Sequence, residues 1–344
     1  MDITLHILTS QLTHVFVLSV AAFLLAMLLT PVYTFIAYRF KFWKKQRTTD
    51  TSGQIIKVFT KLHAEKFKRN IPTMAGAIFV IAIATVTFFF NLDRRETWLP
   101  LAALVGGALV GLLDDIINVR GDGTGVAGLR SSLKFLMITV IGFGLGWYFF
   151  AKLGVDTLTI PFVGDIAIGW LIIPLFGFAV IAAGNAVNIS DGLDGLAGGL
   201  AAIAFGSFGV IALLQGNIML AGFCFTVVGA LLSYLWFNIY PARFFMGDVG
   251  SFALGTSLGV VAMLTNSLLL LPIIGILFVI EAGSSVLQIF SKKVFKRRIF
   301  KSAPVHQHLQ AIGWPETKVT MRFWVIGFVA AFIGVLLALA GGIV

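Results

Sequence analysis

Residues 170–214 read WLIIPLFGFAVIAAGNAVNISDGLDGLAGGLAAIAFGSFGVIALL, and this stretch decides the fold. Its two apolar runs, 170–188 and 196–214, are each long enough to cross a lipid bilayer as a helix of about 20 residues. Where they meet, NAVNISDGLDG (185–195) holds two asparagines and two aspartates. A turn between helices needs only glycine and one asparagine, so the remaining polar residues need another explanation.

The composition is that of an integral membrane protein. Of the 344 residues, 58% are hydrophobic and 12% are charged, and the mean hydropathy is +0.98. Soluble domains are about 45–50% apolar and about 25% charged. The single cysteine, Cys224, lies within an apolar run, which excludes a disulfide framework. Because residues 1–15 contain no Lys or Arg, we expect the first apolar run to be a retained helix.

The apolar runs predict an all-α membrane protein with about ten transmembrane helices, forming a single polytopic domain over residues 1–344. Short joins near residues 216 and 267 predict tight helical hairpins. Segment 152–169 predicts a small β-hairpin outside the membrane, because its β-branched residues are followed by proline and glycine. The runs are 14–38, 72–91, 98–119, 131–151, 170–188, 196–214, 218–237, 251–266, 268–291 and 321–343.

Lys and Arg gather in two segments. Residues 39–71 hold ten of the 25, and residues 292–322 hold eight. The positive-inside rule makes both segments cytoplasmic, which puts both termini outside and loops 120–130, 188–196 and 238–250 on the cytoplasmic face. We therefore interpret the net charge of +10 as membrane orientation and expect no nucleic-acid partner. The basic segments either hold anionic lipid headgroups or serve as orientation signals alone.

Five of the 15 acidic residues lie at cytoplasmic ends of the predicted helices, so distant segments bring carboxylates to one membrane face. Charges near the hydrocarbon are costly and usually functional. Adjacent carboxylates repel unless a cation lies between them, and carboxylates with phosphate and water are typical magnesium ligands. The alternative is a set of helix N-caps and surface ion pairs. The five residues are Asp114, Asp115, Asp191, Asp194 and Asp248.

A further polar motif, SAPVHQHLQAIGWPE (302–316), contains His306 and His308. In an extended strand this spacing places both imidazoles on one side, where they would serve as phosphate contacts or proton carriers. Glu281 lies toward the middle of the apolar run 268–291. We expect it to face the bundle interior and to bond a helix backbone.

At these motifs the chain resembles the phospho-N-acetylmuramoyl-pentapeptide transferases. This family belongs to the superfamily of polyprenyl-phosphate N-acetylhexosamine-1-phosphate transferases. The aspartate motifs are typical of the superfamily, and the run PVHQH…GWPE…RFW resembles this family in particular. The matching motifs span nearly the whole chain: PTMAG (72–76), LLDD (112–115), NAVNISDGLDGLAGG (185–199), PARFFMGDVGS (241–251), EAGSSVLQIF (281–290) and FKSAPVHQHLQAIGWPETKVTMRFW (300–324).

The resemblance implies a magnesium-dependent enzyme of the bacterial cytoplasmic membrane with its active site on the cytoplasmic face. It would transfer phospho-N-acetylmuramoyl-pentapeptide from UDP-MurNAc-pentapeptide to undecaprenyl phosphate, giving lipid I and UMP in peptidoglycan synthesis. Homodimers are common in the family. Two alternatives stay open: a transferase that uses UDP-N-acetylglucosamine or a related donor, and a membrane transporter, although the repeats typical of transporters are not evident.

The resemblance also implies residue roles. Asp248 would ligate magnesium, with Asp114 and Asp115 beside the metal and the lipid phosphate, Asp114 as the candidate base and His306 also in the catalytic set. Gln307 departs from the family pattern, because the middle of three histidines usually stands there; our hypothesis is an altered affinity for nucleotide inhibitors. The implied substrate-binding residues are Lys68, Thr73, Lys134, Asn188, Asp191, Asp194, Asn238, Phe245 and His308.

Overall fold

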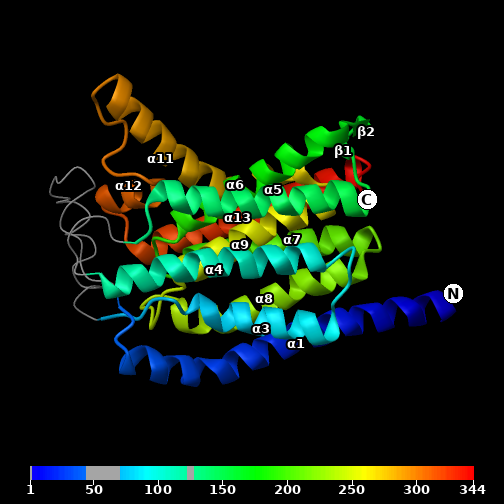
Figure 1. Ribbon diagram of the computed structural model, residues 1–344, viewed down its shortest axis with the longest axis horizontal. Coiled ribbons are helices and arrows are strands. Elements are labelled where there is room, and N and C mark those ends of the chain that lie inside the picture. Colours follow the sequence, from blue (N-terminus) through cyan, green and yellow to red (C-terminus); the bar gives the residue numbers. More distant parts are fainter. Residues whose placement is uncertain (1, 44–69, 122–127) are drawn as a thin grey trace.

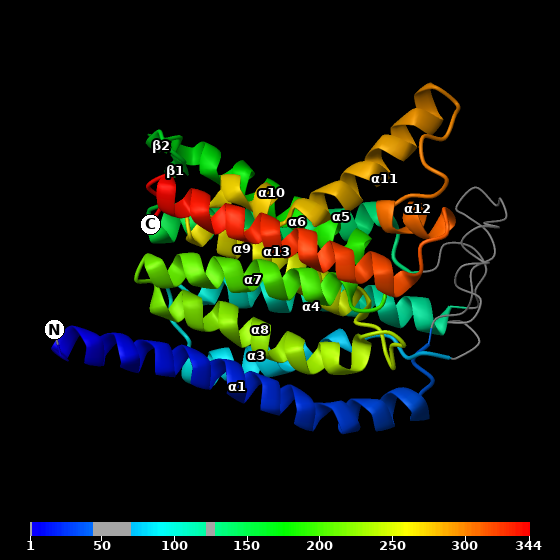
Figure 2. The same cartoon turned by 180° about the vertical axis from the view of Figure 1, so that it is seen from behind.

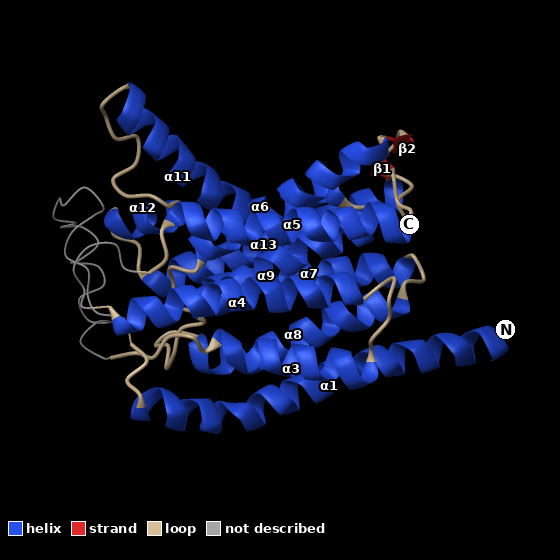
Figure 3. Cartoon of the chain, in the orientation of Figure 1, coloured by secondary structure: helices blue, strands red, loops and turns tan. Residues whose placement is uncertain are grey.

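The computed structural model describes residues 2–43, 70–121 and 128–344, with side chains from residue 9 onward. Its long helices run roughly side by side along one axis, and the two ends of the chain lie at the same end of the bundle (Figure 1, and from behind in Figure 2). Among the described residues, helices supply nearly all the regular structure and the strands form one small hairpin (Figure 3).

Every predicted apolar run is helical over most of its length, which confirms the all-α membrane fold. In the described part of the chain, eight helices are long and apolar enough to cross a membrane, and one bent pair makes up to nine. Helix α3 is apolar but has only 15 residues, so the count of ten spans stays a prediction. The helices are α1 (Asp2–Arg39), α3 (Gly76–Phe90), α4 (Trp98–Arg120), α5 (Ser131–Leu153), η1 (Gly169–Leu171), α6 (Ile172–Ser190), α7 (Leu196–Leu214), α8 (Ile218–Asn238), α9 (Gly247–Leu264), η2 (Leu268–Leu270), α10 (Leu271–Ile274), α11 (Ile276–Val294), α12 (Val305–Ala311) and α13 (Glu316–Ala340).

The β-hairpin predicted within residues 152–169 is present. Strands β1 (Thr157–Ile160) and β2 (Gly164–Ala167) pair antiparallel. The turn between them is tied to the end of α13, because the N–H of Phe162 donates to the carbonyl of Gly341 at 2.9 Å. The hairpin lies at the end of the bundle that holds both chain ends (Figure 1). Its position outside the membrane remains a prediction.

Helix α9 is the centre of the bundle and is almost wholly buried. Glycines allow its neighbours to approach the backbone closely. A Cβ on Gly111 of α4 would overlap the carbonyl oxygen of Asp248, and a Cβ on Gly255 would lie 2.5 Å from the carbonyl oxygen of Ala183 in α6. Since lipid chains are as apolar as the helices themselves, close packing between small residues is what holds such helices together.

Helix α11 leaves the bundle at an angle. The bend between segment 268–274 and α11 is 81°, and the helix projects away from its neighbours (Figure 2). One buried face of α11 is polar and bonds the backbone of the segment that returns beside it; Gln288, for example, accepts the N–H groups of Ile299 and Phe300 at 3.1 Å. Backbone groups without secondary-structure partners are satisfied by such side chains. The polar face consists of Glu281, Ser284, Gln288 and Ser291.

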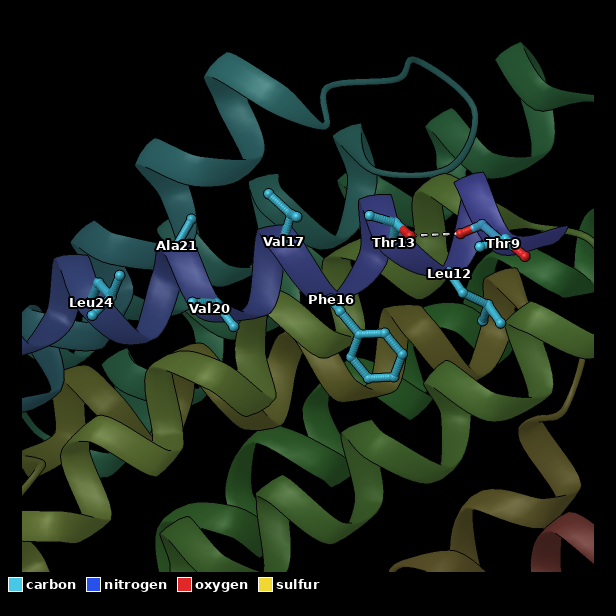
Figure 4. Close-up of a pocket in the computed structure, with 8 residues that line it drawn as sticks. All are labelled: Thr9, Leu12, Thr13, Phe16, Val17, Val20, Ala21 and Leu24. Carbon is cyan, nitrogen blue, oxygen red and sulfur yellow. Dashed lines mark hydrogen bonds between the residues drawn. The ribbon is translucent and has the colours of Figure 1, made fainter. Parts of the chain in front are cut away.

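An apolar hollow of about 610 Å³ lies along α1 (Figure 4). Thr13 is among the few polar residues that line it, and its hydroxyl donates to the carbonyl of Thr9 within the same helix at 2.7 Å. The hollow belongs to the N-terminal half of α1, far from the bundle end where α4 ends (Figure 1). Apolar surface of this kind suits contact with lipid. The lining residues are Thr9, Leu12, Thr13, Phe16, Val17, Val20, Ala21 and Leu24.

The close packing of α9 on α6 predicts a sharp difference between two glycines. We expect Gly255→Ala to destabilise the protein by about 1–3 kcal/mol, because the added methyl group meets backbone. Gly144→Ala in α5 is the matched control, since a Cβ there meets nothing within 4 Å. Thermal unfolding of the two variants in detergent checks this. Equal midpoints for both variants would show that the α6–α9 contact tolerates a methyl group.

Candidate functional site

Three carboxylates form a cluster at one end of the bundle. Asp114 and Asp115 belong to the last turns of α4, and Asp248 to the first turn of α9. Asp114 and Asp115 are 1% and 0% exposed, whereas the Asp248 side chain is 17% exposed. The cluster forms because Gly111, one turn before Asp115, lies directly on the backbone of Asp248. Chain segments more than 130 residues apart therefore meet here.

Backbone and amide donors hold the two buried carboxylates in place. Asp114 accepts the N–H of Leu129 at 2.7 Å and the side-chain amide of Asn118 at 2.9 Å. Asp115 accepts the N–H of Val249 at 3.1 Å. Hydrogen bonds of this kind stabilise the ionised form of a carboxylate. The interpretation of Asp115 as part of a surface ion pair is not supported, because this side chain is completely buried.

Within the described residues, Lys134 is a cation that contacts the cluster. Its ammonium nitrogen lies 3.3 Å from Oδ1 of Asp114 and 3.2 Å from Oδ2 of Asp248. The lysine stands at the start of α5 and is 23% exposed. Lys134 thus joins carboxylates from α4 and α9 at the exposed edge of the cluster.

The three carboxylates fit a divalent metal ion. Their ligand oxygens lie within 4.8 Å of one another. Hard oxygen donors in this number are typical of magnesium and calcium sites. A divalent cation would also offset the mutual repulsion of carboxylates that lie this close together. The arrangement is therefore compatible with a divalent metal.

Thr73 lies beside this cluster. A Cβ on Gly247 would overlap Oδ2 of Asp115 and would stand 2.8 Å from the hydroxyl of Thr73, so both oxygens border the same glycine. Gly247 has φ +70°, which strongly favours glycine. Thr73 is 3% exposed, and its carbonyl accepts the hydroxyl of Tyr33. Lys68 lies outside the described residues.

A second group of predicted residues surrounds the turn between α6 and α7. Asn188 donates to the hydroxyl of Ser251 at 2.9 Å, which ties the end of α6 to α9 three residues after Asp248. The carboxylate of Asp194 accepts the N–H of Ala242 at 2.9 Å. Asp194 thus bonds the loop after α8 and does not serve as the N-cap of α7, where Gly195 stands.

Asn238 and Phe245 belong to the same loop region. The side chain of Asn238 accepts the N–H of Gly195 and donates to the carbonyl of Phe244, each at 2.9 Å. Phe245 is partly exposed, and its backbone pairs with that of Pro72 and Ala75. The N–H groups of residues 194 and 195, just before α7, already donate to the side chains of Glu316 and Asn238.

Helix α13 braces this turn, which the sequence analysis did not predict. Glu316 accepts the N–H of Asp194 at 2.7 Å, Thr320 donates to the carbonyl of Asp194 at 3.2 Å, and Trp324 donates to the carbonyl of Gly195 at 3.1 Å. The three residues stand four apart, so they share one face of the helix. That spacing was the available signal within the GWPE…RFW run.

The two histidines do not lie on one side of a strand, so that expectation is wrong. Residues 305–311 form helix α12, in which positions two apart point to nearly opposite sides. His306 is buried, with Nδ1 2.8 Å from Oε2 of Glu281. His308 instead accepts the N–H of Lys301 at 3.2 Å. Gln307, between them, accepts the hydroxyl of Ser302 at 2.9 Å.

Glu281 does face the interior and does bond backbone, as expected. It is 0% exposed and accepts the N–H of His306 at 3.2 Å. The imidazole of His306 lies against Gly192 in the turn after α6.

The structure brings one set of predicted site residues into a single cluster: Asp114, Asp115, Asp248, Lys134 and Thr73. Asn188, Asp194, Asn238 and His306 lie around the α6–α7 turn that contains Asp191, and His308 bonds a separate segment.

Comparison with known proteins finds relatives along nearly the whole chain. The family described as Glycosyl transferase family 4 matches residues 97–266, which contain all three clustered carboxylates. The chain is 38% identical over 356 residues to a phospho-N-acetylmuramoyl-pentapeptide-transferase of Chloroflexus aurantiacus, covering 99% of this chain and 94% of that protein. Proteins of the same name from Listeria monocytogenes (41% identical; 80% and 86% covered) and Clostridium perfringens (36%; 91% and 95%) are also similar.

The carboxylate cluster predicts a metal-binding difference that requires no assay of activity. We expect Asp248→Asn to weaken the binding of Mn²⁺ at least about tenfold, because the substitution removes one anionic ligand and keeps the size of the side chain. Asp156→Asn is the control, since Asp156 is exposed near the β-hairpin at the opposite end. Electron paramagnetic resonance of free Mn²⁺ measures both. Equal affinities in the two variants would contradict a metal site at the cluster.

Proposed function

Because the chain belongs to the phospho-N-acetylmuramoyl-pentapeptide-transferase family, we propose that its transfer reaction takes place at the carboxylate cluster. The chain is a multi-pass enzyme of the bacterial inner membrane, and it transfers phospho-N-acetylmuramoyl-pentapeptide to a lipid carrier in peptidoglycan synthesis. These relatives favour this function over transfer of N-acetylglucosamine phosphate and over transport. We also propose that residues 1–344 form a single polytopic domain.

The proposed donor is UDP-MurNAc-pentapeptide and the proposed acceptor is undecaprenyl phosphate. An oxygen of the lipid phosphate attacks the phosphorus bonded to the sugar, the bond from that phosphorus to UMP breaks, and lipid I forms. The observation that carries this proposal is a cluster of Asp114, Asp115 and Asp248 with the ammonium of Lys134 between two of them. Transfer between two polyanions needs cations at the reacting phosphates.

We assign magnesium to this cluster, with Asp248 as a ligand and Asp114 and Asp115 beside it. The ion would offset the charge of the two phosphates and of the departing UMP. The partly exposed Asp248 supports this assignment, because a ligand has to reach an ion that substrate phosphates also contact. The two buried carboxylates, which are held by backbone N–H groups, would give the site a rigid base.

Two groups take part in the proposed proton and charge balance at the acceptor. Asp114 is the proposed base, which takes the last proton of the lipid phosphate; the role is modest, because phosphate loses this proton near neutral pH. Lys134 is the proposed phosphate contact. In this proposal its ammonium exchanges a carboxylate oxygen for a phosphate oxygen when the substrates bind. The same groups serve a direct attack and a two-step path through an aspartyl intermediate.

The turn between α6 and α7 is the proposed nucleotide site. Asn188, Asp191 and Asp194 would contact the uridine moiety, with Phe245 stacking on the base. The tie between Asn188 and Ser251 supports this arrangement, because it fixes the turn next to the start of α9, where Asp248 stands. Thr73 borders the cluster, and Asn238 holds the turn; both are proposed to act at the donor.

The lipid acceptor would reach the cluster from the side of α4 and α5. Exposed apolar residues flank the carboxylates there: Leu113 and Ile117 are 47% and 44% exposed, and Leu133 and Leu136 are 44% and 56% exposed. An isoprenoid chain could lie on such a surface. Contacts of the basic segments with anionic lipids, the homodimer and a substrate contact by His308 stay predictions.

The reaction itself is checked by UMP release. We expect the purified protein with undecaprenyl phosphate and magnesium to release UMP from UDP-MurNAc-pentapeptide, and not from UDP-N-acetylglucosamine. EDTA should abolish the release, because the cluster would then lack its cation. Turnover of UDP-N-acetylglucosamine alone would move the chain to another branch of the superfamily. Undiminished turnover in EDTA would contradict the assignment of magnesium.

Replacement of Lys134 should separate metal binding from turnover. We expect Lys134→Met to lower UMP release about 100-fold or more, because a charge contact to phosphate is lost. Mn²⁺ should bind the same variant more tightly than the wild type, since the competing ammonium has been removed. Lys152→Met is the control, because Lys152 lies at the far end of α5 over the ring of Trp147. Weaker Mn²⁺ binding in Lys134→Met would show that the lysine supports the metal instead.

A further inference from the structure

Both oxygens of the Glu281 carboxylate contact His306. Its Oε1 accepts the backbone N–H of His306 at 3.2 Å, and its Oε2 lies 2.8 Å from Nδ1 of the same residue. Glu281 and His306 are 0% and 1% exposed. A buried carboxylate is costly unless hydrogen bonds satisfy it. Both of these contacts are made with His306, which indicates that the carboxylate positions this residue.

This contact decides what the other ring nitrogen can do. When an ionised carboxylate accepts the proton on Nδ1, the ring is held in one orientation and one tautomer. Nε2 of the neutral ring then has a lone pair and accepts hydrogen bonds. Glu281 therefore fixes the direction in which Nε2 of His306 points, and Nε2 accepts hydrogen bonds whenever the ring is neutral.

Nε2 has no hydrogen-bond partner in the described part of the chain, although it is buried. It lies against Gly192, where a Cβ would overlap it and would stand 2.7 Å from Cε1 of the ring. Gly192 is partly exposed and belongs to the turn that also contains Asp191 and Asp194. Leaving a buried polar atom without a hydrogen-bond partner is energetically costly. A ligand that supplies the partner at this turn would remove that cost.

We propose that Glu281 is a positioning residue for the nucleotide donor, holding His306 so that Nε2 accepts a hydrogen bond from an O–H or N–H group of the uridine moiety. The inference rests on the proposed binding of the donor at the α6–α7 turn. Two groups of uridine have this chemistry: the ribose hydroxyls and the imide N–H of the base. Glycine at position 192 is required because any side chain there would displace the imidazole.

A purely structural role for Glu281 is distinguishable, because Ser284 has that role on the same face of α11. Its hydroxyl accepts the N–H of Val305 at 3.1 Å and donates to the carbonyl of Glu281 at 2.8 Å. Ser284 thus helps to hold the start of α12 through the residue next to His306. Ser284→Ala is therefore the matched control.

The first experiment compares the kinetics of Glu281→Gln and Ser284→Ala. Glutamine keeps the size of the side chain and an oxygen that accepts a backbone N–H, but it no longer fixes the proton on Nδ1. We expect Glu281→Gln to raise the KM for UDP-MurNAc-pentapeptide about tenfold with kcat within about threefold, and Ser284→Ala to change neither. Equal effects of the two substitutions, or a fall in kcat alone, would overturn the proposal.

The second experiment tests whether Glu281 acts through His306. Asparagine at position 306 keeps a donor for Glu281 and lacks the second ring nitrogen. We expect the double variant Glu281→Gln/His306→Asn to have the KM of His306→Asn alone, because residues that act as a unit are not additive. Additive increases in KM would overturn the proposal.

The third experiment identifies the donor group with inhibitors. UMP is compared with 2′-deoxy-UMP, 3′-deoxy-UMP and N3-methyl-UMP as a competitor of the donor, in the wild type and in His306→Asn. We expect one analogue to inhibit the wild type about tenfold less well than UMP, and to equal UMP in the variant. Weaker inhibition by either deoxy analogue assigns that ribose hydroxyl, and weaker inhibition by N3-methyl-UMP assigns the imide. Equal inhibition by all four compounds in the wild type would overturn the role of Nε2. An inactive wild type, by contrast, would contradict the proposed function.

Discussion

The site depends on the close approach of α4 to α9 at Gly111. Any side chain at this position would overlap the carbonyl oxygen of Asp248, so the two backbones would have to separate. Their contact brings the end of one helix to the start of the other, and with it the three carboxylates to within 4.8 Å. In a bilayer the surroundings do not drive helices together, because lipid is as apolar as the helix surface. Shape complementarity at small residues is therefore what assembles the charges.

Such an assembly of like charges needs compensation, and the described residues supply part of it in two ways. Backbone N–H groups of Leu129 and Val249 reach the two buried aspartates. The ammonium of Lys134 joins Asp114 to Asp248. A divalent cation, as proposed, would supply the remainder. Each source stabilises ionised carboxylates at the membrane face, where an uncompensated group would shed its charge or force the helices apart. In the proposed reaction, these ionised carboxylates would hold the cation that phosphate transfer needs.

The α6–α7 turn is held by segments from three other parts of the chain. Asn238 and the loop after α8 bond it from one side, and a face of α13 bonds the backbone of Asp194 and Gly195. His306 lies against Gly192 and is itself held by Glu281 in α11. The GWPE…RFW run, which resembles the family most specifically, thus contacts the turn although it stands more than 120 residues away in the sequence. Its side chains bond the backbone of the turn.

The sequence by itself determined the helices and the hairpin, because apolar length and β-branched runs are local properties of the chain; the cytoplasmic side of the carboxylates stays a prediction from the charge distribution. It also placed the chain in its family through motifs along its length. Tertiary structure alone decided that Lys134 stands between Asp114 and Asp248, since helix packing governs contacts between residues more than 100 apart. It also decided that the His306 segment is a helix and not a strand. A short segment takes the conformation that its partners satisfy, and here those partners are the polar residues of α11, which no local pattern in the segment reveals.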